Sequence, residues 1–129
     1  MSKQKTFDKV VNFLMEQGSK SRDRTGNLLI DAKGRRCPAG CLLTKAQCQR
    51  LEKQLADTEY ESLFEVAEIV TLLEDRGHDV MLVDDLRWVH DATHPRRWAH
   101  EFRSVADCHE LDHPKSIKLR QRSAAAGRN

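Results

Sequence analysis

Apolar residues recur at helical spacing in short segments of this chain, and each segment is bounded by a glycine, a proline or a capping residue. The first segment has four apolar residues at the i, i+3, i+4 and i+7 positions: Phe7, Val10, Val11 and Leu14. Thr6 precedes them as a candidate N-cap, and Gly18 follows as a candidate end of the helix. Such segments restrict the chain to short helices that pack their apolar sides together.

The same reasoning predicts further helices along the chain. Pro38 opens a short helical turn, and a helix with a capping box at Gln47 runs from Thr44 to about Leu55. A long helix runs from about Glu59 to Arg76, where Gly77 stops it. A helix capped by Asp79 ends near His90 and Asp91, and a last helix begins at Pro95. Both tryptophans, Trp88 and Trp98, are expected on apolar helical faces.

Only one segment favours strands. The run NLLID and the residues RRC flank a candidate type I turn that Gly34 would close, so residues 27–37 are predicted to form a β-hairpin. The expected fold is mostly α, a compact bundle of about five helices with this one small hairpin. Residues 1–113 are expected to form a single domain, large enough to fold without disulfides. Residues 114–129 are basic and poor in bulky residues, which is typical of a disordered tail.

The net charge of +2 conceals a strong asymmetry along the chain. Residues 1–50 carry eleven Lys and Arg against four acids, whereas residues 51–86 carry eleven acids against two bases. No apolar run approaches the ~18 residues that a membrane span needs, and the amphipathic N-terminus does not resemble a signal peptide. We therefore expect a cytoplasmic protein without a membrane partner, whose cysteines stay reduced.

Four stretches in this order resemble a family of small uncharacterised proteins of bacteriophages, prophages and bacterial genomes. They are DKVVNFLMEQGSKS, GRRCPAGCLL, LLEDRGHDVMLVDDLRWVHD and RRWAHEFRSVAD, within residues 8–107. The family pattern combines a Cys-Ala-x-Gly-x-Leu segment with a helix that ends in His-Asp. This chain departs from it at Asn27, Pro38 and Arg87. The resemblance implies a small phage-type protein of a bacterial host, and it transfers no activity.

Three of the four cysteines lie close together, at positions 37, 41 and 48. A structural zinc site is one interpretation, with Cys37, Cys41, Cys48 and His90 as candidate ligands. A second Cys-x2-Cys pair is absent, and the spacing of Cys37 and Cys41 would also point both side chains into a core. The favoured interpretation is packing of buried thiols around a corner at Gly40, with no cofactor.

The dipeptides His78-Asp79 and His90-Asp91 invite comparison with metal-dependent phosphohydrolases, but both fall at expected helix ends. Helix capping and a hydrogen bond that fixes a corner explain them more simply. The chain has no Gly-x-Ser-x-Gly elbow, phosphate loop or dinucleotide fingerprint. A non-enzymatic protein is therefore expected, and a small metal-dependent enzyme stays an alternative.

Two sets of charged residues are candidate binding sites. An acidic helix face could engage a basic surface of a host or defence protein, through Glu59, Glu61, Glu65, Glu68 and Glu74. Basic residues of the hairpin region and the last helix could instead contact nucleic acid: Lys20, Arg22, Arg24, Lys33, Arg35, Arg36, Arg96 and Arg97, together with the tail. The preferred function is an accessory phage-type protein that binds and modulates a host or defence protein. Nucleic-acid binding is the alternative.

Overall fold

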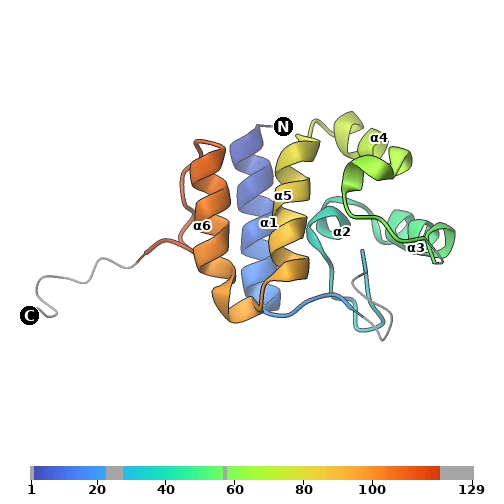
Figure 1. The fold of residues 1–129 in the computed structure, drawn as a ribbon, viewed down its shortest axis with the longest axis horizontal. Coiled ribbons are helices and arrows are strands. Elements are labelled where there is room, and N and C mark those ends of the chain that lie inside the picture. Colours follow the sequence, from blue (N-terminus) through green and yellow to red (C-terminus); the bar gives the residue numbers. More distant parts are fainter. Residues whose placement is uncertain (1, 23–27, 57, 120–129) are drawn as a thin grey trace, which may run out of the picture.

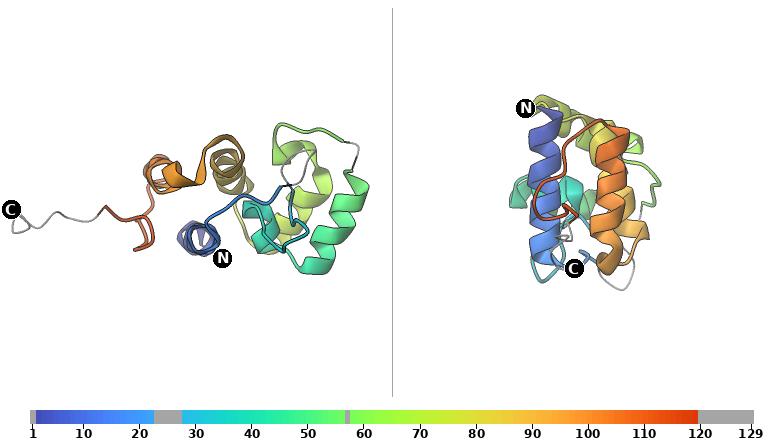
Figure 2. Two further views of the ribbon diagram at one scale, coloured as in Figure 1. Left: turned by 90° about the horizontal axis from the view of Figure 1, so that it is seen from below. Right: turned by 90° about the vertical axis from the view of Figure 1, so that its left-hand side faces the viewer.

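A computed structural model of the chain describes residues 2–22, 28–56 and 58–119, and it confirms a mostly helical fold (Figure 1). In chain order the elements are α1 (Lys3–Gln17), α2 (Pro38–Leu42), α3 (Lys45–Gln54), the 3-10 turn η1 (Leu63–Glu65), α4 (Ala67–Asp75), α5 (Val80–Ala92), the 3-10 turn η2 (Pro95–Arg97) and α6 (Trp98–Cys108). Helices α1, α5 and α6 lie side by side, and the short α2 packs on α1 and α5 (Figures 1 and 2). Helices α3 and α4 lie beyond α2, away from α6.

All six α-helices contribute to one buried apolar cluster. Its largest fully buried side chains include Trp98 and Phe102 of α6, Phe7 of α1 and Ile69 of α4. Each such side chain contributes about 1.5–3 kcal/mol by leaving water. The core therefore holds the short helices together, since few of them would be stable alone. No helix within the described ranges has the length and apolar character needed to cross a bilayer.

Several helix ends confirm the sequence prediction because they depend on local chemistry. Gly18 takes a left-handed conformation with φ of 71°, and its N–H donates to the carbonyl of Leu14. Thr44 and Gln47 form the expected capping box at the start of α3. Asp79 caps α5 by accepting a hydrogen bond from a backbone N–H of its first turn.

The start of α1 differs from the prediction. Ser2 is the N-cap, and its hydroxyl accepts a hydrogen bond from the N–H of Lys5. Thr6 lies inside the helix and is fully buried, with its hydroxyl 2.7 Å from Nδ1 of His78. Thr6 is therefore not the N-cap of α1. It joins α1 to the segment that precedes α5.

The predicted β-hairpin is wrong. Across the described part of residues 27–37, one isolated antiparallel bridge joins Ile30 and Arg36, and no strand is formed. Side chains take up backbone groups that a strand ladder would use: the N–H of Arg36 donates to Gln17, and the N–H of Leu29 donates to Glu52 of α3. The expected turn is present, with Gly34 at φ of 81°. The segment is consequently a loop built around a turn.

The predicted helix from Glu59 to Arg76 is also wrong in its first part. Residues 59–62 are not helical, η1 is a single 3-10 turn, and α4 begins at Ala67. Asp84 of α5 draws the chain out of the helix, because its carboxylate accepts hydrogen bonds from the N–H of Leu63 at 2.8 Å and from the hydroxyl of Ser62 at 3.2 Å. Helix periodicity alone does not predict this contact between distant segments.

The disordered tail expected from residue 114 is wrong for residues 114–119. Ile117 is buried in the core, and its carbonyl accepts a hydrogen bond from the guanidinium of Arg103 at 2.7 Å. Ser116 donates to the side chain of Asn12 on α1 at 2.6 Å. This segment crosses between α6 and α1 (Figure 2). The remaining part of that prediction, residues 120–129, lies outside the described residues.

Candidate functional site

The cysteine cluster surrounds Gly40 of α2, as the sequence predicts. The thiol of Cys37 accepts a hydrogen bond from the N–H of Gly40 at 3.4 Å, and the thiol of Cys48 donates to its carbonyl at the same distance. A Cβ atom at position 40 would lie 1.9 Å from the carbonyl oxygen of Leu29. The two thiols and the glycine therefore serve a close approach between α2 and the loop before it.

The candidate zinc ligands Cys37, Cys41, Cys48 and His90 do not form a metal site. Within the described residues, no group of three or more His, Cys, Asp or Glu side chains is arranged to hold a metal ion. Burial raises the pKa of Cys37 and Cys48, and it raises the pKa of Cys41 to about 12. The thiols of Cys37 and Cys48 instead make hydrogen bonds to Gly40, and the thiol of Cys41 donates to the carbonyl of Pro38 at 3.2 Å.

His90 and Asp91 fix a corner between α5 and the segment after α1. The His90 ring is fully buried, its Nδ1 lies 2.6 Å from Oδ1 of Asp91, and its Nε2 accepts the N–H of Ser21 at 3.2 Å. Because Nε2 accepts, the proton of the ring is on Nδ1 and is donated to Asp91. The ring also stacks on Trp98 with centroids 5.6 Å apart.

Ser21, His90 and Asp91 superficially resemble a hydrolytic triad. The hydroxyl of Ser21 is buried and donates to the carbonyl of Leu28, while His90 Nε2 is 3.5 Å from that hydroxyl and is already occupied by a backbone N–H. A nucleophile must be reachable by substrate and activated by a base that can accept its proton. This arrangement positions a chain segment instead.

The five predicted partner-binding glutamates do not share one helix face. Glu59, Glu61 and Glu65 lie around η1, while Glu68 and Glu74 lie on α4. The carboxylate of Glu65 accepts the N–H of Glu61 at 3.1 Å and closes a capping box, and Glu68 is paired with Arg50. Of the five glutamates, Glu61 and Glu65 therefore lie next to each other, beside α5.

The sequence prediction missed an exposed apolar surface next to this pair. Trp88 is 65% exposed, Met81 is 60% exposed and Phe64 is 53% exposed. Met81 and Trp88 are seven residues apart on α5, which places them on one side of the helix, two turns apart. Phe64 belongs to the segment held against this side of α5, because the backbone N–H of its neighbour Leu63 donates to Asp84. We call Phe64, Met81 and Trp88 the α5 face.

Acidic side chains surround the α5 face. Asp84 and Asp85 lie between Met81 and Trp88, and Glu61 and Glu65 lie beside Phe64. Asp84 is paired with Arg87 at 3.1 Å and Asp85 with His109 at 2.7 Å, so both carboxylates are held in place. We call these four residues (Glu61, Glu65, Asp84 and Asp85) the acidic rim.

The candidate nucleic-acid residues are divided by the fold. Lys20, Arg22 and Arg35 come together around a hollow of about 330 Å³ that Ser19, His94 and Pro95 also line. Arg96 and Arg97 are exposed on η2 beside it, and Lys33 is exposed on the turn. Arg36 serves the fold, since its guanidinium donates to the carbonyls of Gly40 and Leu43. Arg24 lies outside the described residues.

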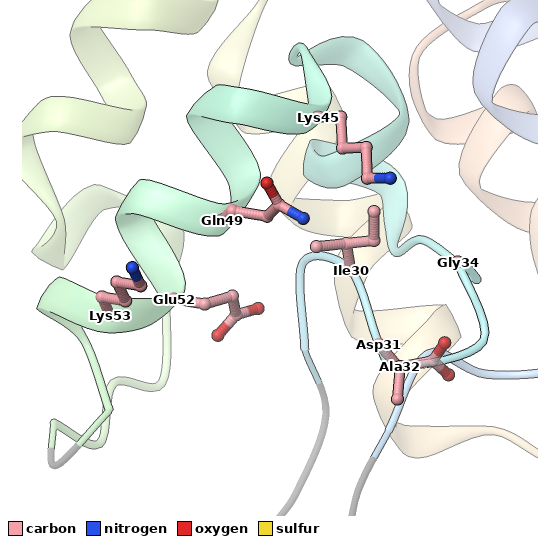
Figure 3. A pocket seen from close by; sticks show the side chains of 8 residues that line it. All are labelled: Ile30, Asp31, Ala32, Gly34, Lys45, Gln49, Glu52 and Lys53. Carbon is pink, nitrogen blue, oxygen red and sulfur yellow. The ribbon is translucent and has the colours of Figure 1, made fainter.

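A larger hollow of about 570 Å³ separates the 30–34 turn from α3 (Figure 3). Lys45, Gln49, Glu52 and Lys53 line one side of it, and Asp31 lines the other. Asp31 is paired with Arg35 at 2.7 Å, and Glu52 accepts the N–H of Leu29. The charges around this hollow are mixed and its acids have partners, so it does not single out a ligand.

Comparisons with protein-family models, curated proteins and solved structures found no match to this chain. The resemblance to small phage proteins therefore stays a prediction from sequence motifs. The α5 face is apolar and exposed, and the hollow of about 330 Å³ is lined by the cations Lys20, Arg22 and Arg35.

Proposed function

We propose that this protein works by binding another protein through the α5 face. The observation that carries the proposal is the exposure of Trp88, which is 65% exposed with Met81 and Phe64 beside it. Tryptophan, methionine and phenylalanine are enriched in interface cores, and tryptophan is among the commonest energetic hot spots. Phe64, Met81 and Trp88 are three of the five large apolar side chains that are exposed among the described residues, and the exposure of Met81 and Trp88 on one side of α5 gives an apolar surface suited to a partner.

The acidic rim identifies the chemistry of that partner. Asp84 and Asp85 lie between Met81 and Trp88, and Glu61 and Glu65 lie beside Phe64, so the complementary surface has apolar side chains opposite these three residues and Lys or Arg opposite the carboxylates. A basic amphipathic helix has this composition and can lie along α5. Opposite charges at the edge speed association and orient the complex, while the apolar centre contributes most of the affinity.

The resemblance to phage and prophage proteins supports a host or defence protein as the class of partner, in the bacterial cytoplasm. Small proteins in that setting can modulate a target by occupying one of its surfaces, without chemistry of their own. This chain would then be an accessory factor that acts by binding.

The test is affinity capture from bacterial lysate, with nuclease present, by the wild-type chain and two variants. We expect a protein captured at near-stoichiometric amounts by wild type to be lost with Trp88→Ala and kept with Phe13→Ala. Phe13 is a matched control because it is a partly exposed aromatic residue on α1. Equal capture by all three chains would contradict the proposal.

The charge prediction has its own measurement. Reversal of the acidic rim by Glu61→Lys and Glu65→Lys should slow association with the captured protein several-fold, with a smaller effect at high salt. Lys45→Glu and Lys53→Glu, on α3, provide a control with the same number of charge changes. An association rate unchanged by reversal of the rim would rule out a basic partner surface.

A further inference from the structure

A second surface, at the opposite end of α5 from Met81, has a different chemistry. Residues 19–22, Arg35 and the start of η2 surround the hollow of about 330 Å³, which we call the basic hollow. Three cations from two separate segments meet there: Lys20, Arg22 and Arg35. The fold, and not sequence proximity, brings Arg35 to the other two.

The backbone and several side chains of the basic hollow are held by hydrogen bonds. Ser21 is anchored through its N–H to His90, and Lys20 Nζ donates to the carbonyl of Asp91 at 2.9 Å. The N–H of Arg22 donates to Asp31 at 3.2 Å, and Nε of Arg35 donates to the same carboxylate at 2.7 Å. The charged groups of Lys20 and Arg35 and the backbone of Arg22 therefore start from defined positions, which lowers the entropy cost of binding an anion.

The acids near the basic hollow are already used within the fold. Asp31 is buried and also accepts the N–H groups of Lys33 and Arg35. Asp91 is paired with Arg87 at 2.8 Å and with His90. Glu101 of α6 is paired with Arg97 at 3.8 Å. Each carboxylate offsets a cation of the local structure, so the remaining guanidinium groups of Arg22 and Arg96 give the surface an excess of positive charge.

His94 adds a neutral donor to this surface. Its Nδ1 accepts the N–H of Arg96 at 3.1 Å, so its Nε2 carries the ring proton even when the ring is uncharged. Arg96 and Arg97 extend the cationic surface past the hollow, and both are exposed. Charge therefore continues beyond the reach of a single phosphate group.

We propose that the basic hollow binds the phosphate backbone of a nucleic acid. Arginine guanidinium groups and a histidine N–H are the donors that phosphate oxygens accept best. A row of cations longer than one phosphate favours a polymer over a free anion. None of the described exposed aromatic residues (Phe13, Phe64 and Trp88) lines the hollow, so base stacking does not contribute there. The contact is expected to be sequence-independent and strongly dependent on salt.

This inference is separate from the proposed partner-binding function, because it uses neither the α5 face nor the acidic rim. The experiment is fluorescence polarisation of a labelled 20-base-pair duplex and a labelled single strand of the same length, with the full chain, from 25 to 200 mM NaCl. The matched variants are Arg22→Ala/Arg96→Ala, in the basic hollow and on η2 beside it, and Lys45→Ala/Lys53→Ala on α3, which lower the net charge equally.

We expect wild type to bind with micromolar affinity at low salt and without sequence preference. Because each phosphate contact contributes about −0.9 to the slope of log K against log salt, Arg22→Ala/Arg96→Ala should make that slope less negative by about 2. Its affinity at the lowest salt should fall about tenfold or more, while Lys45→Ala/Lys53→Ala stays within about twofold of wild type. Circular dichroism verifies that each variant is folded.

Two results would overturn the inference. An equal loss of affinity in both double variants would assign any binding to net charge and not to the basic hollow. The second result is saturation of the hollow by inorganic phosphate at millimolar concentration, measured by NMR shifts of residues 19–22, in a protein that does not bind the duplex. This result would show that the hollow binds a free anion and not a nucleic acid. In either case the result of the affinity capture at Trp88 would be unaffected, so the two proposals fail independently.

Discussion

The two tryptophans lie ten residues apart and occupy opposite environments. Trp98 is 1% exposed, its Nε1 donates to the carbonyl of Thr93 at 3.0 Å, and its ring packs against His90 and Phe102. Trp88 lies on the outer side of the neighbouring helix and is 65% exposed. The same residue type therefore closes the core at one position and forms an unpartnered surface at the other.

This comparison extends to the residues that first suggest chemistry. The cysteines around Gly40 and the dyad of His90 and Asp91 resemble Trp98, because their polar atoms have partners within the fold. The α5 face differs from both the cysteines and the dyad, because its large apolar side chains are exposed to solvent. The polar atoms of Cys37, Cys48 and His90 therefore serve the structure, whereas the α5 face is left exposed.

The largest expected effect is at the buried tryptophan. Trp98→Ala should lower the free energy of unfolding by about 3–5 kcal/mol, because it leaves a cavity between α5 and α6 and removes the ring that stacks on His90. Urea denaturation followed by circular dichroism measures the change. Trp98→Phe should cost clearly less than Trp98→Ala, since a ring still fills part of the space. A loss below about 1 kcal/mol for Trp98→Ala would mean that the core does not depend on this contact.

Gly40 tests the corner around the cysteines. Gly40→Ala forces a Cβ atom against the carbonyl oxygen of Leu29 and should cost about 3 kcal/mol, since backbone must move. Gly34→Ala is the matched control: its Cβ would meet open space, so only the left-handed backbone conformation opposes it, at about 1 kcal/mol. Equal costs at the two positions would show that α2 and the loop are not in close contact.

Local signals in the sequence account for most of the fold that was predicted. Gly18, the Thr44 and Gln47 pair, and Asp79 each act on backbone groups within a few residues, so the printed sequence contains everything they need. Contacts between distant segments explain the errors. Asp84 keeps Ser62 and Leu63 out of the predicted long helix from 22 and 21 residues away, and the core buries Ile117 although its neighbours are polar.

The candidate site was predicted only in part, for a similar reason. The packing of the cysteines around Gly40 was predicted from spacing, because Cys37 and Cys41 share a side of a short helical turn. The α5 face was missed because Trp88 was expected on an apolar helical face, whereas the buried stripe of α5 contains Leu82, Leu86 and Val89. At about 100° per residue, Trp88 and Met81 fall off that stripe together. The seven-residue spacing of Met81 and Trp88 was therefore the sequence signal that could have located the α5 face.

His78 gives a smaller, pH-dependent effect on the buried side of the molecule. Burial lowers the pKa of His78 below its ordinary value of 6.5, and the positive charges of Lys9 and Arg76 lower it further. Between that lowered pKa and 6.5 the unfolded chain binds more protons than the folded one, so stability is lost as the pH falls through this window and is fully present above it.

Replacement of His78 should remove that pH dependence. Thermal denaturation at about pH 7.5 and about pH 5.5 should give a smaller difference in Tm for His78→Gln than for wild type. His100→Gln, at a largely exposed histidine, is the control and should keep the wild-type difference. An unchanged difference in His78→Gln would assign the acid sensitivity to other groups.

The smallest expected effect on stability is at Trp88, and its small size is what makes this residue informative. Trp88→Ala removes a side chain that is mostly in water, so the free energy of unfolding should change by about 0.5 kcal/mol or less. Urea denaturation beside Trp98→Ala gives the comparison directly. If Trp88→Ala abolishes capture of a partner while unfolding at the wild-type midpoint, the loss belongs to recognition. A cost of about 2 kcal/mol or more would instead show that Trp88 packs within the fold, and the α5 face would no longer be a free surface.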